Sequence, residues 1–229
     1  MAALSGAVIV FDLDGTLVDT APDLAAALNG MLAEQGLRPL PFDEARSLIG
    51  HGARRMVERG LAAAGAPAQG GDLDAQFARF LVRYEAHIAD ASRPYPGVVE
   101  ALTELKAAGA RLAVCTNKLT GLSTALLDGL GLSPLFDAVV GPDMAGAAKP
   151  DPRHLLAAIE AAGGTPNRAV MVGDAAPDAE AARAAGARLI LVSFGYSDTP
   201  AAALSPDILI DGFEALPQAC LRLLGACEA

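Results

Sequence analysis

A short run of apolar residues ends at two closely spaced aspartates, Asp12 and Asp14, within the stretch "VIVFDLDGTLVDT". Carboxylates repel one another and prefer water, so two of them at the end of a buried strand suggest a chemical role. A carboxylate at a strand end can attack phosphorus and form an aspartyl-phosphate, which is the role that we predict for Asp12. A second carboxylate beside it can protonate the leaving oxygen and then deprotonate water, and we predict this role for Asp14.

Polar residues that could serve the same chemistry follow three later segments of the chain. They are Thr116 and Asn117, Lys149 in "AAKPDP", and Asp174 and Asp178 in "GDAAPD". Ligands of open parallel sheets bind outside the carboxyl ends of the strands, so residues at these ends should meet at one edge. Each residue alone has an ordinary explanation as a cap, turn or loop residue, and the prediction depends on their meeting.

Such a cluster would bind a metal ion and a phosphoryl group. Asp12, Asp14 and Asp174 would repel one another at close range, and a hard divalent cation such as Mg²⁺ relieves that repulsion. The ammonium of Lys149 and the hydroxyl of Thr116 would hold the other phosphoryl oxygens, together with backbone N–H groups. The predicted phosphate-binding residues are therefore Thr116, Asn117 and Lys149.

The elements that must position these residues alternate between strands and helices. Continuous apolar runs predict six strands buried on both faces, over residues 7–11, 111–116, 137–141, 169–174, 187–195 and 207–212. Helical spacing between proline and glycine signals predicts helices over residues 97–109, 152–164 and 178–186. This alternation predicts the α/β class, with a Rossmann-like parallel sheet and helices on both faces.

One region interrupts the alternation and is expected to contain no strand. Its apolar residues recur at helical spacing and predict helices over residues 22–36, 43–49, 53–64 and 72–90. We therefore expect a helical domain of residues 20–93, inserted into a core domain of residues 1–19 and 94–229. Asp19 lies at the exit toward this insert and is predicted to be a hinge or helix-start residue.

Composition argues against several classes of protein. The 229-residue chain is 52% hydrophobic, but no stretch approaches the roughly 18 consecutive apolar residues of a membrane-spanning helix. The net charge of −10 argues against nucleic-acid and anionic-membrane partners. Cys115, Cys220 and Cys227 lack metal-binding or CxxC spacing, which predicts reduced thiols in a cytoplasmic protein. The apolar N-terminal run leads directly into carboxylates and is interpreted as the first strand, not as a signal peptide.

The motifs, taken together, resemble those of the haloacid-dehalogenase-like hydrolase superfamily. The matching stretches are "DLDGT" from Asp12, Thr116 with Asn117, Lys149 in "KPDP", and "GDAAPD". The resemblance implies a Rossmann-like core with an inserted helical cap, and hydrolysis of phosphomonoesters through an aspartyl-phosphate with Mg²⁺. It implies that Lys149 stabilises the nucleophile and the phosphate. The implied metal site consists of Asp12, Asp14, which also offers its backbone carbonyl, Asp174, and Asp178, which ligates the metal or holds a metal-bound water.

Within this superfamily the chain is similar to the phosphoglycolate phosphatase family. The similarity covers the stretches at residues 11–29, 49–61, 95–98 and 115–118. It implies 2-phosphoglycolate, a small phosphorylated metabolite, as the substrate, a place in carbohydrate metabolism, and a monomer or homodimer. The chain departs from many relatives at Ala175 and Pro177, where they carry a hydroxyl residue and Asn, so hydrogen bonding around the metal site is expected to differ.

The inserted domain is expected to select the substrate. In "IGHGARR", glycines flank His51 and Arg54 follows closely, so either side chain could meet a substrate carboxylate. Alternative activities are another small-phosphoester or sugar-phosphate phosphatase, a pyrophosphatase and a β-phosphoglucomutase-like enzyme. Asp14 and the acids of "GDAAPD" argue against a metal-independent dehalogenase. A non-enzymatic phospho-acceptor signalling domain would be much shorter and would lack the insert.

Overall fold

The computed structural model describes residues 3–50 and 52–225. The chain divides into two compact units. One comprises the residues up to Val18 and those from Pro94 onward, and is called the α/β unit here; the other comprises Asp19–Arg93 and is called the helical unit.

The α/β unit is built around a six-stranded sheet in which every pair of neighbouring strands is parallel. The strands lie in the order β5 (Ala138–Val140), β4 (Arg111–Cys115), β1 (Val8–Phe11), β6 (Ala169–Gly173), β7 (Arg188–Val192) and β8 (Ile208–Ile210). The predicted parallel α/β sheet and its six strands are confirmed. Because β1 lies between β4 and β6, the first motif of the chain is placed at the centre of the sheet.

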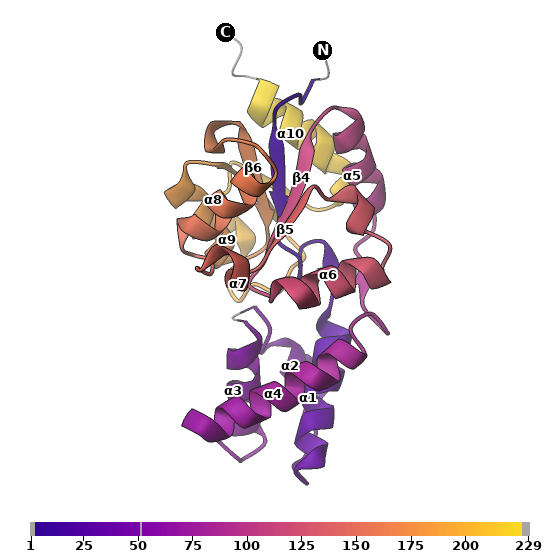
Figure 1. Cartoon of the computed structure of the whole chain (residues 1–229), viewed down its shortest axis with the longest axis vertical. Helices are drawn as coiled ribbons and strands as arrows, with labels where there is room; N and C mark the ends of the chain where they lie inside the picture. The colour runs from indigo at the N-terminus through magenta and orange to yellow at the C-terminus, as the bar shows by residue number, and fades with distance from the viewer. Residues whose placement is uncertain (1–2, 51, 226–229) are drawn as a thin grey trace. The chain divides into compact units, whose positions relative to one another are not determined.

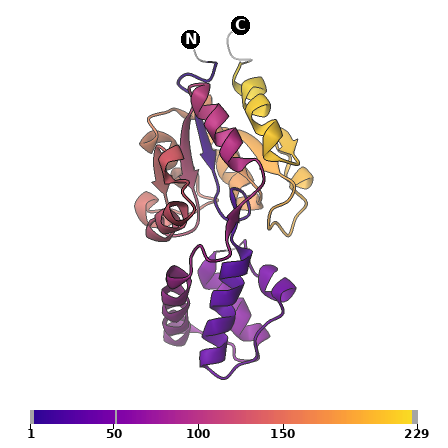
Figure 2. The same cartoon turned by 90° about the vertical axis from the view of Figure 1, so that its right-hand side faces the viewer.

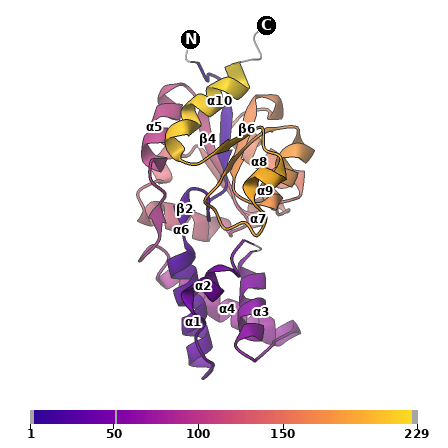
Figure 3. The ribbon, with the colours of Figure 1, turned by 180° about the vertical axis from the view of Figure 1, so that it is seen from behind.

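Helices cover both faces of this sheet. Figures 1 and 3 show α8 (Pro152–Ala161) and α9 (Ala176–Ala185) on one side, and α5 (Val98–Ala107) and α6 (Thr120–Gly129) on the other. The C-terminal helix α10 (Leu216–Leu224) packs against α5, and the short α7 (Pro142–Ala145) packs against α8. Short 3₁₀ helices occur at Ser133–Leu135, Pro166–Arg168, Ala201–Leu204 and Phe213–Ala215.

The core of the α/β unit is made largely of small and branched aliphatic side chains. Val8 and Val10 of β1 are buried with Leu155 and Ile159 of α8 in one cluster. Several alanines of α8 and α9 complete that cluster, and their small side chains let these helices approach the sheet closely. The chain contains few aromatic residues, so close packing of small side chains fills this core. The dense packing makes the carboxyl edge of the sheet a rigid support for a site.

The helical unit contains α1 (Ala21–Glu34), α2 (Phe42–Arg46), α3 (Ala53–Ala63) and α4 (Gly70–Ala86), as Figure 2 shows. Helix α1 packs against the other three helices. Its apolar face buries Leu28, Met31 and Leu32, and α4 contributes Phe80 and Tyr84, whose rings stack with centroids 5.9 Å apart. The helical spacing of these residues therefore reflects burial in a core that belongs to this unit.

The chain passes between the two units twice, and the crossing segments pair as a two-stranded sheet of β2 (Val18–Asp19) and β3 (Arg93–Pro94). The expectation that this region contains no strand is therefore wrong. Strands of two residues are too short to produce an alternating pattern, so only the paired partner defines them. Asp19 accepts a hydrogen bond from the backbone N–H of Ala21, the first residue of α1, at 3.3 Å, whereas Thr20 occupies the N-cap position.

A buried carboxylate in α1 organises the return crossing. Asp23 accepts hydrogen bonds from the backbone N–H groups of Ala91, at 2.9 Å, and Ser92, at 2.7 Å, and from the Ser92 hydroxyl at 2.6 Å. Sequence reasoning did not single out Asp23, because its partners lie 68 and 69 residues further along the chain.

Candidate active site

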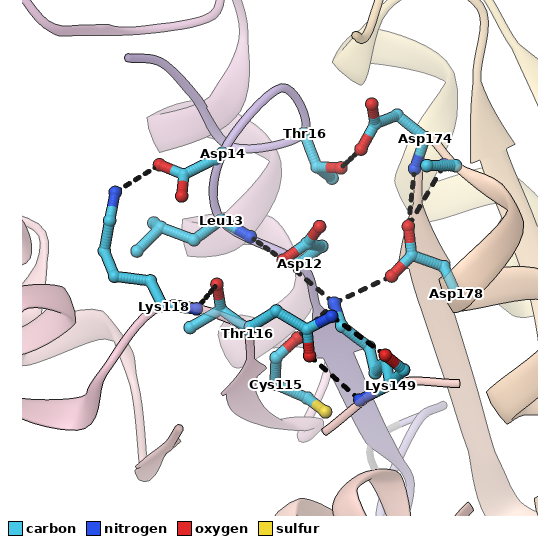
Figure 4. A network of polar contacts seen from close by, with 12 residues as sticks. Asp12, Leu13, Asp14, Thr16, Cys115, Thr116, Lys118, Lys149, Asp174 and Asp178 are labelled. Atoms are coloured by element: carbon cyan, nitrogen blue, oxygen red, sulfur yellow. Dashed lines mark hydrogen bonds and ion pairs between the residues drawn. The ribbon is translucent and has the colours of Figure 1, made fainter. Parts of the chain in front are cut away.

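The carboxyl ends of three neighbouring strands bring the predicted residues together (Figure 4). Asp12 directly follows β1, Thr116 follows β4 and Asp174 follows β6. Phe11, the last residue of β1, pairs with Val114 on one side and Val172 on the other, so the three strands end at nearly the same level. The sheet register therefore places a carboxylate, a hydroxyl and a second carboxylate around one point.

A tight turn after Asp12 carries the chain past Asp174. Its Gly15 has a φ of 82° and donates its N–H to the carbonyl of Val18 at 2.9 Å. A Cβ atom at Gly15 would lie 2.8 Å from the ring of Tyr196 and 3.0 Å from the carboxylate of Asp174. Glycine is thus required both by the left-handed backbone and by the close approach of neighbouring groups, as the predicted turn demands.

The carboxylate of Asp12 is held through one of its two oxygens. Oδ1 accepts hydrogen bonds from the N–H of Leu13 at 2.7 Å and from the ammonium of Lys149 at 2.9 Å. Oδ2 has no hydrogen bond to any residue within 3–50 or 52–225. Burial, with a smaller contribution from the charges of Asp178 and Asp14, raises the pKa of Asp12 to about 6, although Lys149 opposes the rise.

Lys149 is a buried cation, with 2% of its side chain exposed. Its Nζ donates to Asp178 Oδ1 at 2.7 Å, to the carbonyl of Cys115 at 2.7 Å and to Asp12 Oδ1. Burial by itself would lower the pKa of this ammonium, but the charges of Asp12 and Asp178 outweigh it and raise the pKa. Lys149 therefore remains positively charged beside the predicted nucleophile.

The backbone of Lys149 is clamped from two sides. Asn117 accepts the Lys149 N–H through Oδ1 and donates Nδ2 to the Lys149 carbonyl, both at 2.9 Å. His154 contacts the same N–H through Nδ1 at 3.2 Å and the carbonyl of Val140 through Nε2 at 3.0 Å. Burial lowers the pKa of His154, and a neutral ring that donates through Nε2 fits both contacts. Because the Asn117 side chain is engaged here, its predicted contribution to phosphate binding would come from its backbone N–H.

Three carboxylates form a compact group that could hold a cation. Asp12, Asp174 and Asp178 each offer an oxygen, and these atoms lie within 4.8 Å of one another. Burial, reinforced by the charges of Asp178 and Asp12, raises the pKa of Asp174 to about 8. An all-oxygen donor set whose negative charge is not fully compensated suits a hard divalent cation.

The remaining contacts of Asp174 and Asp178 orient this group. Asp174 accepts from the Thr16 hydroxyl through Oδ1 at 2.9 Å and from the N–H of Tyr196 through Oδ2 at 2.7 Å. Asp178 accepts the N–H groups of Asp174 and Ala175 through Oδ2, both at 3.1 Å. Ala175 offers no side-chain oxygen at the start of α9, and Asp178 satisfies these N–H groups instead.

Asp14 lies apart from that carboxylate group, on the other side of Asp12 in Figure 4. Its Oδ1 pairs with the ammonium of Lys118 at 2.5 Å, and the lysine side chain is only 6% exposed. Thr116 Oγ1 accepts the N–H of Lys118 at 3.2 Å, so the hydroxyl can still donate its own proton. The Asp14 carboxylate is thus engaged with Lys118 and is not part of the carboxylate group.

A family model described as haloacid dehalogenase-like hydrolase matches residues 7–186 of this chain. The chain belongs to the haloacid dehalogenase-like hydrolase family. The match includes every residue of the carboxylate group, Lys149, Thr116 and Asp14.

Individual relatives can be aligned with nearly the whole length of this hydrolase. A protein of Caulobacter vibrioides named phosphoglycolate phosphatase is 58% identical over 226 residues, which is 99% of this chain and 95% of that protein. A crystal structure of a predicted phosphoglycolate phosphatase from Haemophilus somnus has a TM-score of 0.86 and 31% identity, covering 94% of this chain and 98% of that one. CbbY from Rhodobacter sphaeroides, solved in complex with phosphate, has a TM-score of 0.77 and 28% identity, with coverage of 94% and 98%.

Two residues of the hydrolase's helical unit, His51 and Arg54, were predicted to contact the substrate. His51 lies outside the described residues. Arg54, in α3, pairs with Asp74 of α4 at 2.7 Å, and both side chains are exposed. A substrate contact by either residue stays a prediction.

Several residues of the hydrolase's site were missed by sequence reasoning. Lys118 directly follows the predicted pair at Thr116 and Asn117, and its position next to that pair was the available signal. Thr16 lies within the first motif and His154 follows "KPDPR", but neither pattern indicates which residue the side chain would bind. Tyr196 carries no signal, because only the fold brings the loop after β7 to Asp174.

No helix in the described parts of the chain is long and apolar enough to span a bilayer.

Proposed function

We propose that this hydrolase converts 2-phosphoglycolate and water into glycolate and inorganic phosphate. The observation that carries the choice of substrate is the 58% identity, over 99% of the chain, to a protein named phosphoglycolate phosphatase. The chemistry is supported by the fixed carboxylate of Asp12, which has a buried ammonium on one oxygen and the other oxygen turned to no hydrogen-bond donor among the described residues.

In the first step, Asp12 Oδ2 attacks phosphorus and the bond from phosphorus to the glycolate oxygen breaks. Lys149 offsets the repulsion between the attacking carboxylate and the phosphate, and the Thr116 hydroxyl donates a hydrogen bond to a phosphoryl oxygen. Asp14, in its protonated form, transfers a proton to the leaving oxygen, which departs as glycolate. The products of this step are an aspartyl-phosphate at Asp12 and an ionised Asp14.

In the second step, Asp14 removes a proton from a water molecule, and the oxygen of that water attacks phosphorus. The bond between phosphorus and Asp12 Oδ2 breaks, which releases inorganic phosphate and regenerates the carboxylate. Asp14 is protonated again and ready for the next substrate. Asp14 is thus proposed as acid in the first step and base in the second.

Mg²⁺ is the proposed cofactor, held by Asp12, Asp174 and the backbone carbonyl of Asp14. Asp178, whose oxygens bind Lys149 and two N–H groups, is proposed to hold a metal-bound water and to orient its neighbours. When bound, the cation neutralises negative charge on the phosphoryl group and on the carboxylates. We also propose that the protein is cytoplasmic and is a monomer or a homodimer.

The direct test is phosphate release by the purified protein in the presence of Mg²⁺. Substrates to compare are 2-phosphoglycolate, hexose phosphates, pyrophosphate and nucleoside monophosphates. We expect the highest kcat/KM for 2-phosphoglycolate, and no release by Asp12→Asn, which keeps the Oδ1 contacts but removes the nucleophilic charge. Preference for a hexose phosphate would refute the substrate. Full activity of Asp12→Asn would refute the mechanism.

A further inference from the structure

We propose that Lys118 is a substrate-specificity residue whose ammonium binds the carboxylate of the leaving group. The α/β unit would then select phosphoesters that carry a carboxylate next to the ester carbon. This inference rests on the proposed function and assigns part of the substrate recognition to a residue that the phosphoryl chemistry does not use.

The position of Lys118 is the first argument. Its side chain is 6% exposed, and its Nζ lies 2.5 Å from Asp14 Oδ1, whose carboxylate is 22% exposed. A lysine that is nearly buried loses hydration and side-chain entropy, so its ammonium must be stabilised by the groups that it faces. The backbone N–H of Lys118 also binds Thr116 Oγ1, which fixes the start of the side chain beside the predicted phosphate site.

The chemistry of Asp14 supplies the second argument. To protonate the leaving oxygen, Asp14 must come within hydrogen-bond distance of it. In 2-phosphoglycolate a single methylene carbon separates that oxygen from the carboxylate. A cation bonded to Asp14 is therefore close to the place that the carboxylate must occupy. An ammonium has three N–H donors and can contact Asp14 and a substrate carboxylate together.

The distribution of charge supplies the third argument. The site holds two lysines, and Figure 4 shows them on different sides of Asp12. Lys149 contacts Asp12 and Asp178, where the phosphoryl group and a cation would bind. Lys118 pairs with Asp14. The two cations thus match a substrate with two anionic ends, a phosphate and a carboxylate.

The test compares two substrates that differ at one end. They are 2-phosphoglycolate and 2-hydroxyethyl phosphate, in which a neutral hydroxymethyl group replaces the carboxylate. The variants are Lys118→Met and Lys118→Arg. Lys106→Met is the matched control, because it removes the same charge from a lysine that binds the Leu135 carbonyl and Asp137, outside the site.

We expect Lys118→Met to lower kcat/KM for 2-phosphoglycolate at least about tenfold more than for 2-hydroxyethyl phosphate, since a hydrogen bond to a charged group is lost. Lys118→Arg should keep most of the wild-type preference, and Lys106→Met should keep all of it. An equal loss for both substrates would overturn the proposal, because Lys118 would then act only through Asp14.

A binding measurement separates this inference from the proposed function and from folding defects. In the Asp12→Asn background, calorimetry with both compounds reports affinity without turnover. Adding Lys118→Met should weaken 2-phosphoglycolate about tenfold and leave 2-hydroxyethyl phosphate unchanged. Equal affinities with and without Lys118 would refute the proposal, even if 2-phosphoglycolate is hydrolysed. Selective weakening would support it even if another carboxylate-bearing phosphoester proves the better substrate. Retained binding of 2-hydroxyethyl phosphate shows that the variant is folded.

Discussion

Removing divalent cations should make the stability of this protein depend on pH in a particular direction. The perturbation is chelation, which leaves the three carboxylates of Asp12, Asp174 and Asp178 without a metal ion, with Lys149 paired to Asp12 and Asp178. The pKa of Asp12 is about 6 and that of Asp174 about 8 in the folded protein, against 3.8 for an ordinary aspartate. A folded-state pKa that is raised favours folding at low pH, and this contribution is lost as the pH rises through the raised value.

The size of the effect follows from the shift of Asp174. Between its unfolded and folded pKa values, one such group costs about 1.4 kcal/mol of unfolding free energy per pH unit. From pH 5.5 to pH 8, the metal-free protein should therefore lose about 3 kcal/mol through Asp174, and Asp12 adds a smaller loss. For a protein of this size, that corresponds to a melting temperature lower by about 6–12 °C.

The assay is thermal unfolding at pH 5.5 and pH 8, with a chelator or with excess Mg²⁺. The decisive quantity is the rise in melting temperature produced by Mg²⁺, because groups outside the cluster contribute equally with and without the metal. His154 is one such group, since its lowered pKa stabilises the fold as the pH rises. We expect the rise to be much larger at pH 8 than at pH 5.5, because Asp12 and Asp174 are far less protonated at pH 8 and compete less with the metal.

Asp12→Asn is the matched variant, since its amide oxygen can keep the contacts to Leu13 and Lys149. Without the Asp12 charge, the pKa of Asp174 should fall, and the metal-free variant should lose less stability over the same range. An Mg²⁺-induced shift that is equal at both pH values, or larger at pH 5.5, would show that the three carboxylates do not form the cation site.

Three further predictions address the supports of the site. Gly15→Ala should destabilise the fold by about 2–4 kcal/mol, since it combines a left-handed φ with a clash against Tyr196. The control Gly6→Ala has a φ of 75° and nothing within 4 Å of the added Cβ, so it should cost only about 1 kcal/mol. Equal losses of stability in urea unfolding would exclude the clash. His154→Ala should lower kcat about tenfold with little change in KM, because the hydrogen bond from the Lys149 N–H to the ring is lost. His154→Asn should restore part of kcat, because its amide oxygen can accept the Lys149 N–H. If kcat is not restored, His154 does not position Lys149 through this hydrogen bond. Asp23→Ala should destabilise the protein by about 2–3 kcal/mol and increase hydrogen exchange at the amides of Ala91 and Ser92, because both lose their acceptor. Unchanged exchange at these amides would contradict the role of Asp23 in holding the return crossing.

The parts of the fold that could be predicted are those whose signals are local. The four inner strands of the main sheet, β4, β1, β6 and β7, are continuous apolar runs because both of their faces are buried, and α8 begins at Pro152 after the Asp151 cap. The short strands β2 and β3 escaped prediction for the opposite reason. Two residues carry no periodicity, and these segments are strands only through their pairing with one another.

For the candidate site, residue types and their places at strand ends determined which residues to consider. Asp12, Thr116, Lys149 and Asp174 could be selected from sequence, because parallel strands that end together present their following residues at one edge. Tertiary structure alone decided how the polar atoms are paired. The Thr16–Asp174 bond joins residues 158 positions apart, and the Lys118–Asp14 bond joins residues 104 positions apart. Hydrogen bonds depend on distance and direction in space, and a linear pattern records neither for groups so far apart. The sequence therefore determined the chemistry available at this edge of the sheet, whereas only the folded chain decided that Lys149 also pairs with Asp178 and that Lys118 pairs with Asp14.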